Sequence, residues 1–142
     1  MTIKALLDRN PHQVITVSPD TSVSDAVALL AEKRIGALPV VRAGECLGIF
    51  SERDVIYCLE QKGAEALSLS VGQVMTAPPI CTEPERTVLS VLAEMTRRRI
   101  RHLPVIDKGA MVGFVSIGDL VKYRIDTIEA EANAMREYIQ GA

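Results

Sequence analysis

Apolar residues recur along this chain in two spacings that alternate. Two stretches carry apolar residues at the i, i+3, i+4 and i+7 positions that line one face of a helix. These residues are Val23, Ala26, Val27 and Leu30 in the first stretch and Val88, Val91, Leu92 and Met95 in the second. Ser22 and Thr87 stand directly before them, where a helix N-cap belongs. The pattern predicts two helices, each with one buried face.

Short apolar runs follow each predicted helix and indicate β-hairpins. The runs are residues 37–41 and 47–50 in the first half, and residues 103–106 and 111–115 in the second. A few residues that include a glycine separate the two runs of each pair, which is typical of a hairpin turn. A short strand before each helix, over residues 14–17 and 80–82, and a second helix beginning at Ser51 or Ser116 complete the predicted elements.

The two halves are copies of one unit. From Ile15, which falls on Ile80, the halves align without a gap at a constant offset of 65 positions. Other matched pairs are Pro19 and Pro84, Arg34 and Arg99, Pro39 and Pro104, and Asp54 and Asp119. An ungapped match of this length indicates an internal duplication. We expect a mixed α/β (α+β) fold of two pseudo-symmetric β-α-β-β-α repeats, whose sheets pack against each other and form one core.

The duplication also divides the chain. We expect the first repeat with its N-terminal segment over residues 1–66, the second repeat over 67–128 and a C-terminal helical extension over 129–142, with a linker region near 62–72.

Apolar residues at spacings of three and four continue beyond the second repeat. They are Ile125, Ile128, Ala132, Met135 and Ile139, and they predict a long helix from about Asp119 to Gln140. This apolar stripe must pack against another surface. That surface is either the chain's own repeat or N-terminal segment, or a second copy of the chain. We favour the second copy and expect a homodimer, because the two sheets already occupy each other.

Composition narrows the class of protein. The chain has 142 residues, 48% hydrophobic and 24% charged, with a formal net charge of −2. Its apolar runs are far shorter than the roughly 20 residues that cross a bilayer, and its first residues lack the apolar segment of a secretory signal. We therefore expect a cytoplasmic location and no membrane partner. Cys46, Cys58 and Cys81 fit neither a disulfide framework nor a metal site, and we expect packing residues.

One motif occurs twice. Residues 48–54, GIFSERD, return as residues 113–119, GFVSIGD, with glycine, serine and aspartate at the same spacing. One interpretation is a helix cap, because Ser-x-x-Asp resembles a capping box. The other is a ligand site, in which the serine and the helix N-terminus face a phosphate, the aspartate accepts the hydrogens of a ribose diol and the glycine lets the ligand approach the strand.

The doubled Gly-apolar-x-Ser-x-x-Asp motif, preceded each time by an apolar-Pro-Val strand, resembles a tandem pair of CBS domains, the Bateman module. The resemblance covers about residues 15–125. It implies a stand-alone bacterial type of CBS protein that pairs as a dimer and binds an adenosine compound in two clefts between its repeats. AMP is the first expectation, with ATP, ADP, NADH or S-adenosylmethionine as alternatives and no metal. The resemblance also implies regulation of another protein, which the sequence does not identify.

The resemblance assigns roles to particular residues. Asp54 and Asp119 would bind ribose hydroxyls, and Ser51 and Ser116 phosphate or ribose oxygens. The adenine pocket would be lined by Thr16, Ala37, Leu38, Pro39, Thr82, His102, Leu103 and Pro104. Arg101, His102 and Arg53 would face phosphates, and Gly118 replaces Arg53 in the second copy. Because Gly36 and Ala37 stand where the second repeat has Arg101 and His102, we do not expect two equivalent sites.

Other functions find less support in the sequence. No catalytic set of residues or metal-ligand spacing indicates an enzyme. The basic run Arg97–His102 suggests nucleic acid, but it lacks interleaved aromatic residues, and we expect Arg97 and Arg98 to end a helix. His12, in a polar loop, is expected to be solvated. The main alternative to a nucleotide-binding regulator is a structural dimerisation module with no physiological ligand.

Overall fold

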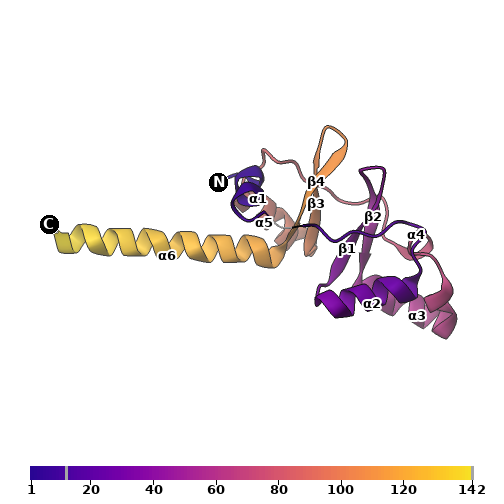
Figure 1. Cartoon of the computed structure of the whole chain (residues 1–142). Coiled ribbons are helices and arrows are strands. Elements are labelled where there is room, and N and C mark those ends of the chain that lie inside the picture. The colour runs from indigo at the N-terminus through magenta and orange to yellow at the C-terminus, as the bar shows by residue number, and fades with distance from the viewer. Residues whose placement is uncertain (12, 142) are drawn as a thin grey trace.

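The computed structural model describes residues 1–11 and 13–141, which form two β-hairpins with helices around them (Figure 1). The helices are α1 (Ile3–Arg9), α2 (Val23–Lys33), α3 (Glu52–Lys62), the 3₁₀ helix η1 (Gly63–Ser68), α4 (Val71–Val74), α5 (Val88–Arg98) and α6 (Ile117–Gly141). The strands are β1 (Ala37–Arg42), β2 (Glu45–Ser51), β3 (His102–Asp107) and β4 (Ala110–Ser116). The mixed α/β class and the two pseudo-symmetric halves are as predicted.

Both hairpins have the predicted antiparallel pairing, β1 with β2 and β3 with β4. Both turns have the same backbone conformation, with positive φ at Ala43 and Gly44 and at Lys108 and Gly109, as a two-residue type I′ turn requires. The strands predicted over residues 14–17 and 80–82 are wrong in extent. Each is reduced to one parallel bridge, from Val17 to Val40 and from Thr82 to Val105.

The helix signals in the sequence are confirmed. The Ser22 hydroxyl accepts a hydrogen bond from the backbone N–H of Asp25 at the start of α2, and Thr87 accepts one from Ser90 at the start of α5. The fully or largely buried residues of these helices are Val23, Ala26 and Leu30 in α2 and Val88, Val91 and Met95 in α5. Each apolar stripe therefore faces a core.

The prediction of one shared core is wrong, because the buried apolar residues form two clusters. The first contains Val23, Leu38, Phe50 and Cys58, and the second contains Val88, Leu103, Val115 and Leu120. The hairpins still meet, since β2 lies against β4 and the Met111 N–H donates to the Gly44 carbonyl at 3.1 Å. Each hairpin carries its own helices and therefore its own core. Cys46 and Cys58 are buried, as expected of packing residues, whereas Cys81 is exposed.

The two cores exchange segments of the chain. Ile3 and Leu6 of α1 belong to the cluster of the second half, whereas Ala66 of η1 and Val71 of α4 belong to that of the first. The backbone hydrogen bonds are equivalent. The N–H groups of Ile3 and Lys4 donate to the carbonyls of Arg86 and Pro84, and those of Val71 and Gly72 donate to Thr21 and Pro19. Helix α1 thus corresponds to α4, and each packs on the half that the sequence boundary at 66/67 assigns to the other. The segment expected as a linker, residues 62–72, instead contributes Ala66 and Val71 to a core.

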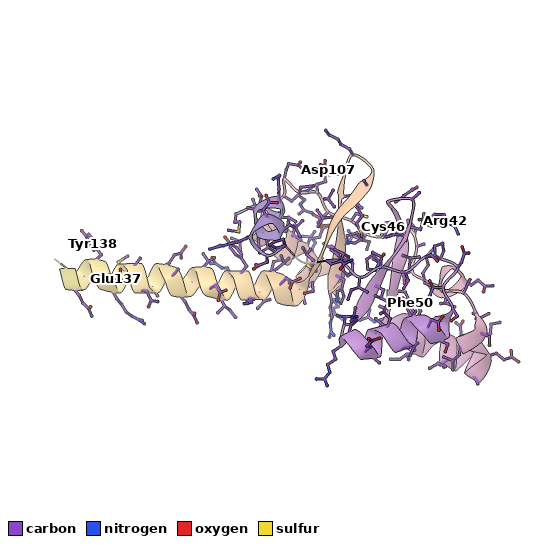
Figure 2. All side chains as sticks on the ribbon, in the orientation of Figure 1. Arg42, Cys46, Phe50, Asp107, Glu137 and Tyr138 are labelled. Carbon is purple, nitrogen blue, oxygen red and sulfur yellow. The ribbon has the colours of Figure 1, made fainter. Side chains whose placement is uncertain are left out.

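Helix α6 extends away from the rest of the molecule (Figure 1). Leu120 is its buried residue, and the described residues from Ile128 onward are all exposed. Glu137 and Tyr138 project from its far end (Figure 2). The alternative in which this helix folds back on its own repeat is therefore wrong. Among the residues described, no helix combines the length and apolar character that spanning a membrane requires.

Candidate ligand-binding cleft

A cleft of about 220 Å³ lies where the two halves meet. Its lining comes from the loop before α2, from β1 and the residues before it, from both strands of the second hairpin and from the start of α6. The lining residues are Gln13, Val14, Ile15, Ile35, Ala37, His102, Phe114, Ser116 and Asp119. The predicted residues Ala37, His102, Ser116 and Asp119 are therefore brought together from opposite halves of the chain.

His102 and Phe114 form an aromatic surface in this cleft. Their rings stack with centroids 5.5 Å apart and planes 12° from parallel, because His102 lies opposite Ser116 on the neighbouring strand, two residues beyond Phe114. Burial lowers the pKa of His102, the Asp119 and Glu52 carboxylates partly offset this effect, and Arg101 lowers the pKa further. The imidazole is thus held in its neutral form at neutral pH.

Ser116 and Asp119 cap α6 and still keep groups available. The Ser116 N–H donates to Asp119 Oδ2 at 2.9 Å, and the Asp119 N–H donates to Ser116 Oγ at 3.1 Å. Asp119 is exposed. Among residues 1–11 and 13–141, Asp119 Oδ1 accepts no hydrogen bond and the Ser116 hydroxyl finds no acceptor. The capping and ligand-binding interpretations are therefore compatible at this motif.

In the first copy of the motif, both carboxylate oxygens of Asp54 accept hydrogen bonds from the protein itself. Asp54 is 8% exposed. Its Oδ2 accepts from the Ser51 N–H at 2.8 Å and the Ser51 hydroxyl at 3.1 Å, and its Oδ1 accepts from the Thr76 hydroxyl at 2.8 Å. The capping box is complete, and both carboxylate oxygens have partners. Asp54 does not line the cleft.

Thr76 explains why the two motifs differ. The peptide groups of Thr76 and Ile49 exchange two hydrogen bonds, of 3.0 and 2.9 Å, which hold the Thr76 hydroxyl at Asp54. The residue equivalent to Thr76 in the other half is Asp8, since α1 corresponds to α4. A carboxylate cannot donate to Asp119, and Asp8 pairs with Lys4 instead. Asp119 is consequently left open to solvent.

The expected role of the two glycines is wrong, because protein segments occupy the space beside them. A Cβ at Gly48 would lie 2.7 Å from the Thr76 carbonyl oxygen and 2.7 Å from Met75 Sδ, and one at Gly113 would lie 2.6 Å from Leu7 Cδ1. Gly48 therefore makes room for the residues directly after α4, and Gly113 for Leu7 of α1, and neither makes room for a ligand.

The remaining predicted residues lie outside the cleft lining. Leu38, Pro39, Leu103 and Pro104 are buried within the hairpins, and Arg53, Arg101 and Gly118 are exposed. Thr16 is exposed, whereas Thr82 is 3% exposed with no hydrogen-bond partner for its hydroxyl. These two threonines are not equivalent, since the offset of 65 matches Thr82 to Val17, so they face opposite sides. His12 lies outside the described residues.

Five lining residues were not predicted from the sequence: Gln13, Val14, Ile15, Ile35 and Phe114. The hairpin register carried a signal for Phe114, since pairing His102 with Ser116 sets Phe114 diagonally beside His102 on the same face. No comparable pattern in the sequence indicated that residues 13–15 would line the cleft.

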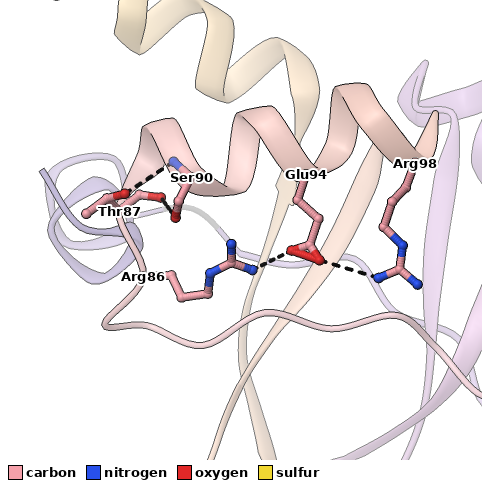
Figure 3. Close-up of polar contacts among 5 residues, drawn as sticks. All are labelled: Arg86, Thr87, Ser90, Glu94 and Arg98. Carbon is pink, nitrogen blue, oxygen red and sulfur yellow. Dashed lines mark hydrogen bonds and ion pairs between the residues drawn. The ribbon is translucent and has the colours of Figure 1, made fainter.

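One residue of the basic run, Arg98, forms an ion pair away from the cleft (Figure 3). Arg97 and Arg98 lie in the last turn of α5, as predicted. Glu94 pairs with Arg86 and, at 3.4 Å, with Arg98. Hydrogen bonding to Arg86 lowers the pKa of Glu94 below its ordinary value. Arg86 thus ties α5 to the segment before it, and Arg98 pairs with the same carboxylate from within the helix.

Two further features of the described residues, 1–11 and 13–141, help to define the site. A wider groove of about 420 Å³, beside Leu7, Asp8 and Val112, lacks both Ser116 and Asp119. No group of three or more His, Cys, Asp or Glu side chains in these residues is arranged to hold a metal ion. The smaller cleft therefore combines the polar and aromatic groups.

The fold and the cleft define a duplicated α/β module with a small-molecule-sized cleft between its copies. The CBS domain model matches residues 4–61 and again residues 71–126. The chain belongs to the CBS-domain family and carries two CBS domains.

Relatives of known sequence contain the same pair. The chain is 39% identical over 127 residues to the mitochondrial CBS domain-containing protein CBSX3 of Arabidopsis thaliana, matching 86% of this chain but 62% of that protein. It is 30% identical to the CBS domain-containing protein YhcV of Bacillus subtilis, over 83% of this chain and 84% of YhcV. It also matches inosine-5'-monophosphate dehydrogenase of Korarchaeum cryptofilum at 39% identity, but spans 22% of that enzyme.

Solved structures agree with the fold. The CBS-domain protein ATU1752 from Agrobacterium tumefaciens superposes with a TM-score of 0.81 at 40% identity, covering 87% of this chain and 99% of that one. CBSX2, solved in complex with AMP, superposes with a TM-score of 0.75 at 26% identity, covering 89% and 97%. CBS-domain pairs similar to this chain therefore include one with a bound adenosine nucleotide.

Proposed function

We propose that this chain is a regulatory module that binds an adenosine nucleotide, AMP in the first place, in the cleft at Asp119. One observation carries the proposal: the cleft joins a carboxylate and a hydroxyl with unused hydrogen-bonding capacity to a stacked aromatic pair, His102 and Phe114. The AMP complex of CBSX2 supports the choice of ligand.

Each group in the cleft suits one part of the nucleotide. Asp119 Oδ1 accepts the hydrogens of the ribose hydroxyls, as a carboxylate does in charge-assisted hydrogen bonds. The base packs against the apolar Ile35 and Ala37 and the aromatic surface of His102, where desolvation of a flat ring is favourable. Arg101 is exposed and close enough to His102 for its charge to lower the pKa of the imidazole. Its guanidinium supplies the cation for the phosphate.

The same reasoning gives one nucleotide per chain. Asp54 already satisfies both oxygens with Ser51 and Thr76, so a ribose there would have to displace the Thr76 hydroxyl. A nucleotide at Asp119 contacts residues of both halves and so favours one arrangement of the halves over others, which is the basis for acting on a partner protein. A cytoplasmic location belongs to the same proposal.

Calorimetry tests the binding step. We expect AMP to bind with a stoichiometry of one, and Asp119→Asn to weaken binding by about tenfold or more through loss of a charged acceptor. ATP, ADP, NADH and S-adenosylmethionine are titrated alongside to rank the ligands. The matched control is Asp25→Asn, because Asp25 has the same place in the Ser22 cap of α2 but does not line this cleft. Failure of all five ligands to bind at millimolar concentration contradicts the proposal, and so does equal weakening by the control.

A structural homodimerisation module without a physiological ligand is the second candidate. The exposed apolar side chains of α6 favour it, since Ile125, Ile128, Met135 and Ile139 are each about half exposed or more. Self-association of a chain that binds none of the nucleotides would identify this function.

A further inference from the structure

The apolar residues of α6 repeat in heptads. Val121, Ile125, Ile128, Ala132, Met135 and Ile139 are spaced alternately by four and three residues. This is the a/d pattern of a coiled coil, with Ile125, Ala132 and Ile139 at a positions and Val121, Ile128 and Met135 at d positions. A helix buried against a globular core usually has a wider apolar face. The narrow seam fits one neighbouring helix.

The described residues, 1–11 and 13–141, leave this seam exposed. Val121 is 39% exposed, Ile128 47%, Met135 59% and Ile139 67%. The part of α6 beyond Ile128 touches no other element and projects from the body (Figures 1 and 2). An isolated helix of about 12–15 residues is only marginally stable in water. The outer half of α6 therefore needs a partner along this seam.

The charges beside the seam indicate what that partner is. Arg124 and Glu131 occupy g positions, and Glu129 and Arg136 occupy e positions. None of these four side chains forms an ion pair within residues 1–11 and 13–141. In a parallel pair of helices, a g residue faces the e residue five positions later in the other chain. This geometry pairs Arg124 with Glu129 and Glu131 with Arg136, in both directions, so all four charges gain a partner of opposite sign.

An antiparallel pair has the opposite outcome. With the two seams fully overlapped, e residues face e residues and g residues face g residues. Glu129 would then lie beside Glu129 of the other chain, Glu131 beside Glu131, and Lys122 beside Arg136. Like charges at these positions destabilise the pair.

We propose that α6 forms a parallel two-stranded coiled coil with α6 of a second copy of this chain. The two bodies then lie at the same end of the coil, related by a two-fold axis along it. This inference is independent of nucleotide binding, because α6 residues beyond Asp119 do not line the cleft.

Disulfide trapping tests the orientation. Met135→Cys is made in a Cys81→Ser background, since Cys81 is the exposed cysteine of the chain and Cys46 and Cys58 are buried. A parallel coil brings residue 135 of both chains face to face, whereas an antiparallel coil sets it against residue 125. The matched control is Glu137→Cys, at the outward f position. We expect oxidation to yield covalent dimer for Met135→Cys and several-fold less for Glu137→Cys.

Charge reversal tests the pairing. Arg136→Glu sets two pairs of like charges in each dimer, and we expect the dissociation constant, measured by sedimentation equilibrium, to rise about tenfold. The double variant Glu131→Arg with Arg136→Glu restores opposite signs and should return to within about twofold of the parent. Neither residue has an ionic partner within residues 1–11 and 13–141, so the reversal acts between chains.

The proposal fails if equal amounts of cross-linked dimer form at positions 135 and 137, or if a mixture of Ile125→Cys and Met135→Cys chains cross-links more readily than Met135→Cys alone. It also fails if the double variant stays as weak as Arg136→Glu, or if the parent chain is a monomer at tens of micromolar. Cross-linking at 135 together with rescue by the double variant supports it.

Discussion

Asp54 and Asp119 occupy equivalent positions in the two repeats, yet their replacement should have different consequences for stability. Asp54 is buried and accepts three hydrogen bonds, one of them from Thr76, 22 positions further along the chain. Asp119 is exposed and accepts one, from the Ser116 N–H within its own helix cap. We therefore expect Asp54→Ala to destabilise the folded chain much more than Asp119→Ala.

The size of the difference follows from these contacts. A hydrogen bond to a charged group contributes about 1.5–3 kcal/mol, but the three bonds share one carboxylate and do not add. We expect Asp54→Ala to lower the free energy of unfolding by about 3 kcal/mol, because it leaves the Ser51 N–H and the Thr76 hydroxyl without their acceptor. Asp119→Ala removes only an exposed cap contact and should cost about 1 kcal/mol. Thr76→Val, which keeps the shape of the side chain, should cost about 1–1.5 kcal/mol.

Urea unfolding followed by circular dichroism measures these values. All variants are compared without nucleotide and at one protein concentration, since ligand binding and self-association both shift apparent stability. Equal losses of unfolding free energy for Asp54→Ala and Asp119→Ala would refute the argument that Asp54, unlike Asp119, is held by hydrogen bonds from other parts of the protein. A neutral effect of Thr76→Val would show that its hydroxyl does not hold the carboxylate.

Three further changes test the cleft and its surroundings. Arg101→Ala should weaken AMP and ATP at least several-fold more than adenosine, since its guanidinium gains a partner only when phosphate is present; equal loss for adenosine in calorimetry would assign the residue to folding. The lowered pKa of His102 means that the unfolded chain binds its proton more readily, so stability should fall as the pH drops below the ordinary value of 6.5. His102→Gln should flatten thermal unfolding profiles in that range, and an unchanged slope would contradict the assignment. The pKa of Glu94 is lowered by Arg86, so its contribution is complete above the ordinary value of 4.5 and is lost as the pH falls through the folded value; Glu94→Gln should be less stable than the parent near pH 6 and more nearly equal to it near pH 3.

Local patterns predicted the repeated elements well. The spacing of Val23, Ala26 and Leu30 along α2, and the hydroxyl of Ser22 before it, act within one or two turns of helix, so the sequence contains the whole cause of that element. The hairpin turns are similar, because Gly44 and Gly109 supply the backbone freedom that the turns require. The strands over 14–17 and 80–82 were overestimated, because pairing in each is limited to a single bridge beside β1 or β3.

The candidate cleft was less predictable, because its asymmetry originates outside the aligned repeat. Thr76 and Asp8 become equivalent only through the packing of α4 and α1, and the sequence separation from Asp8 to Pro19 is longer than that from Thr76 to Pro84. An ungapped alignment starting at Ile15 cannot match them. Ala37, His102, Ser116 and Asp119 were each predicted as site residues from family resemblance, and the structure brings these four to one cleft.

The exchange of α1 and α4 determines where the chain can be divided. A fragment of residues 1–66 would carry Ile3 and Leu6 without the core they fill, and would lack Val71. A fragment of residues 13–76 would contain every buried residue of the first cluster.

During synthesis, Ile3 and Leu6 are made first, but the second core that they complete can form only after Leu103 and Val115 have been made. Each half thus holds a piece of chain that leads into the other. A force that displaces α1 from the second half would open the second core. The same force would also act on residues 13–15, which line the cleft. A mechanical load on the N-terminal segment would therefore reach the candidate cleft without passing through the first core.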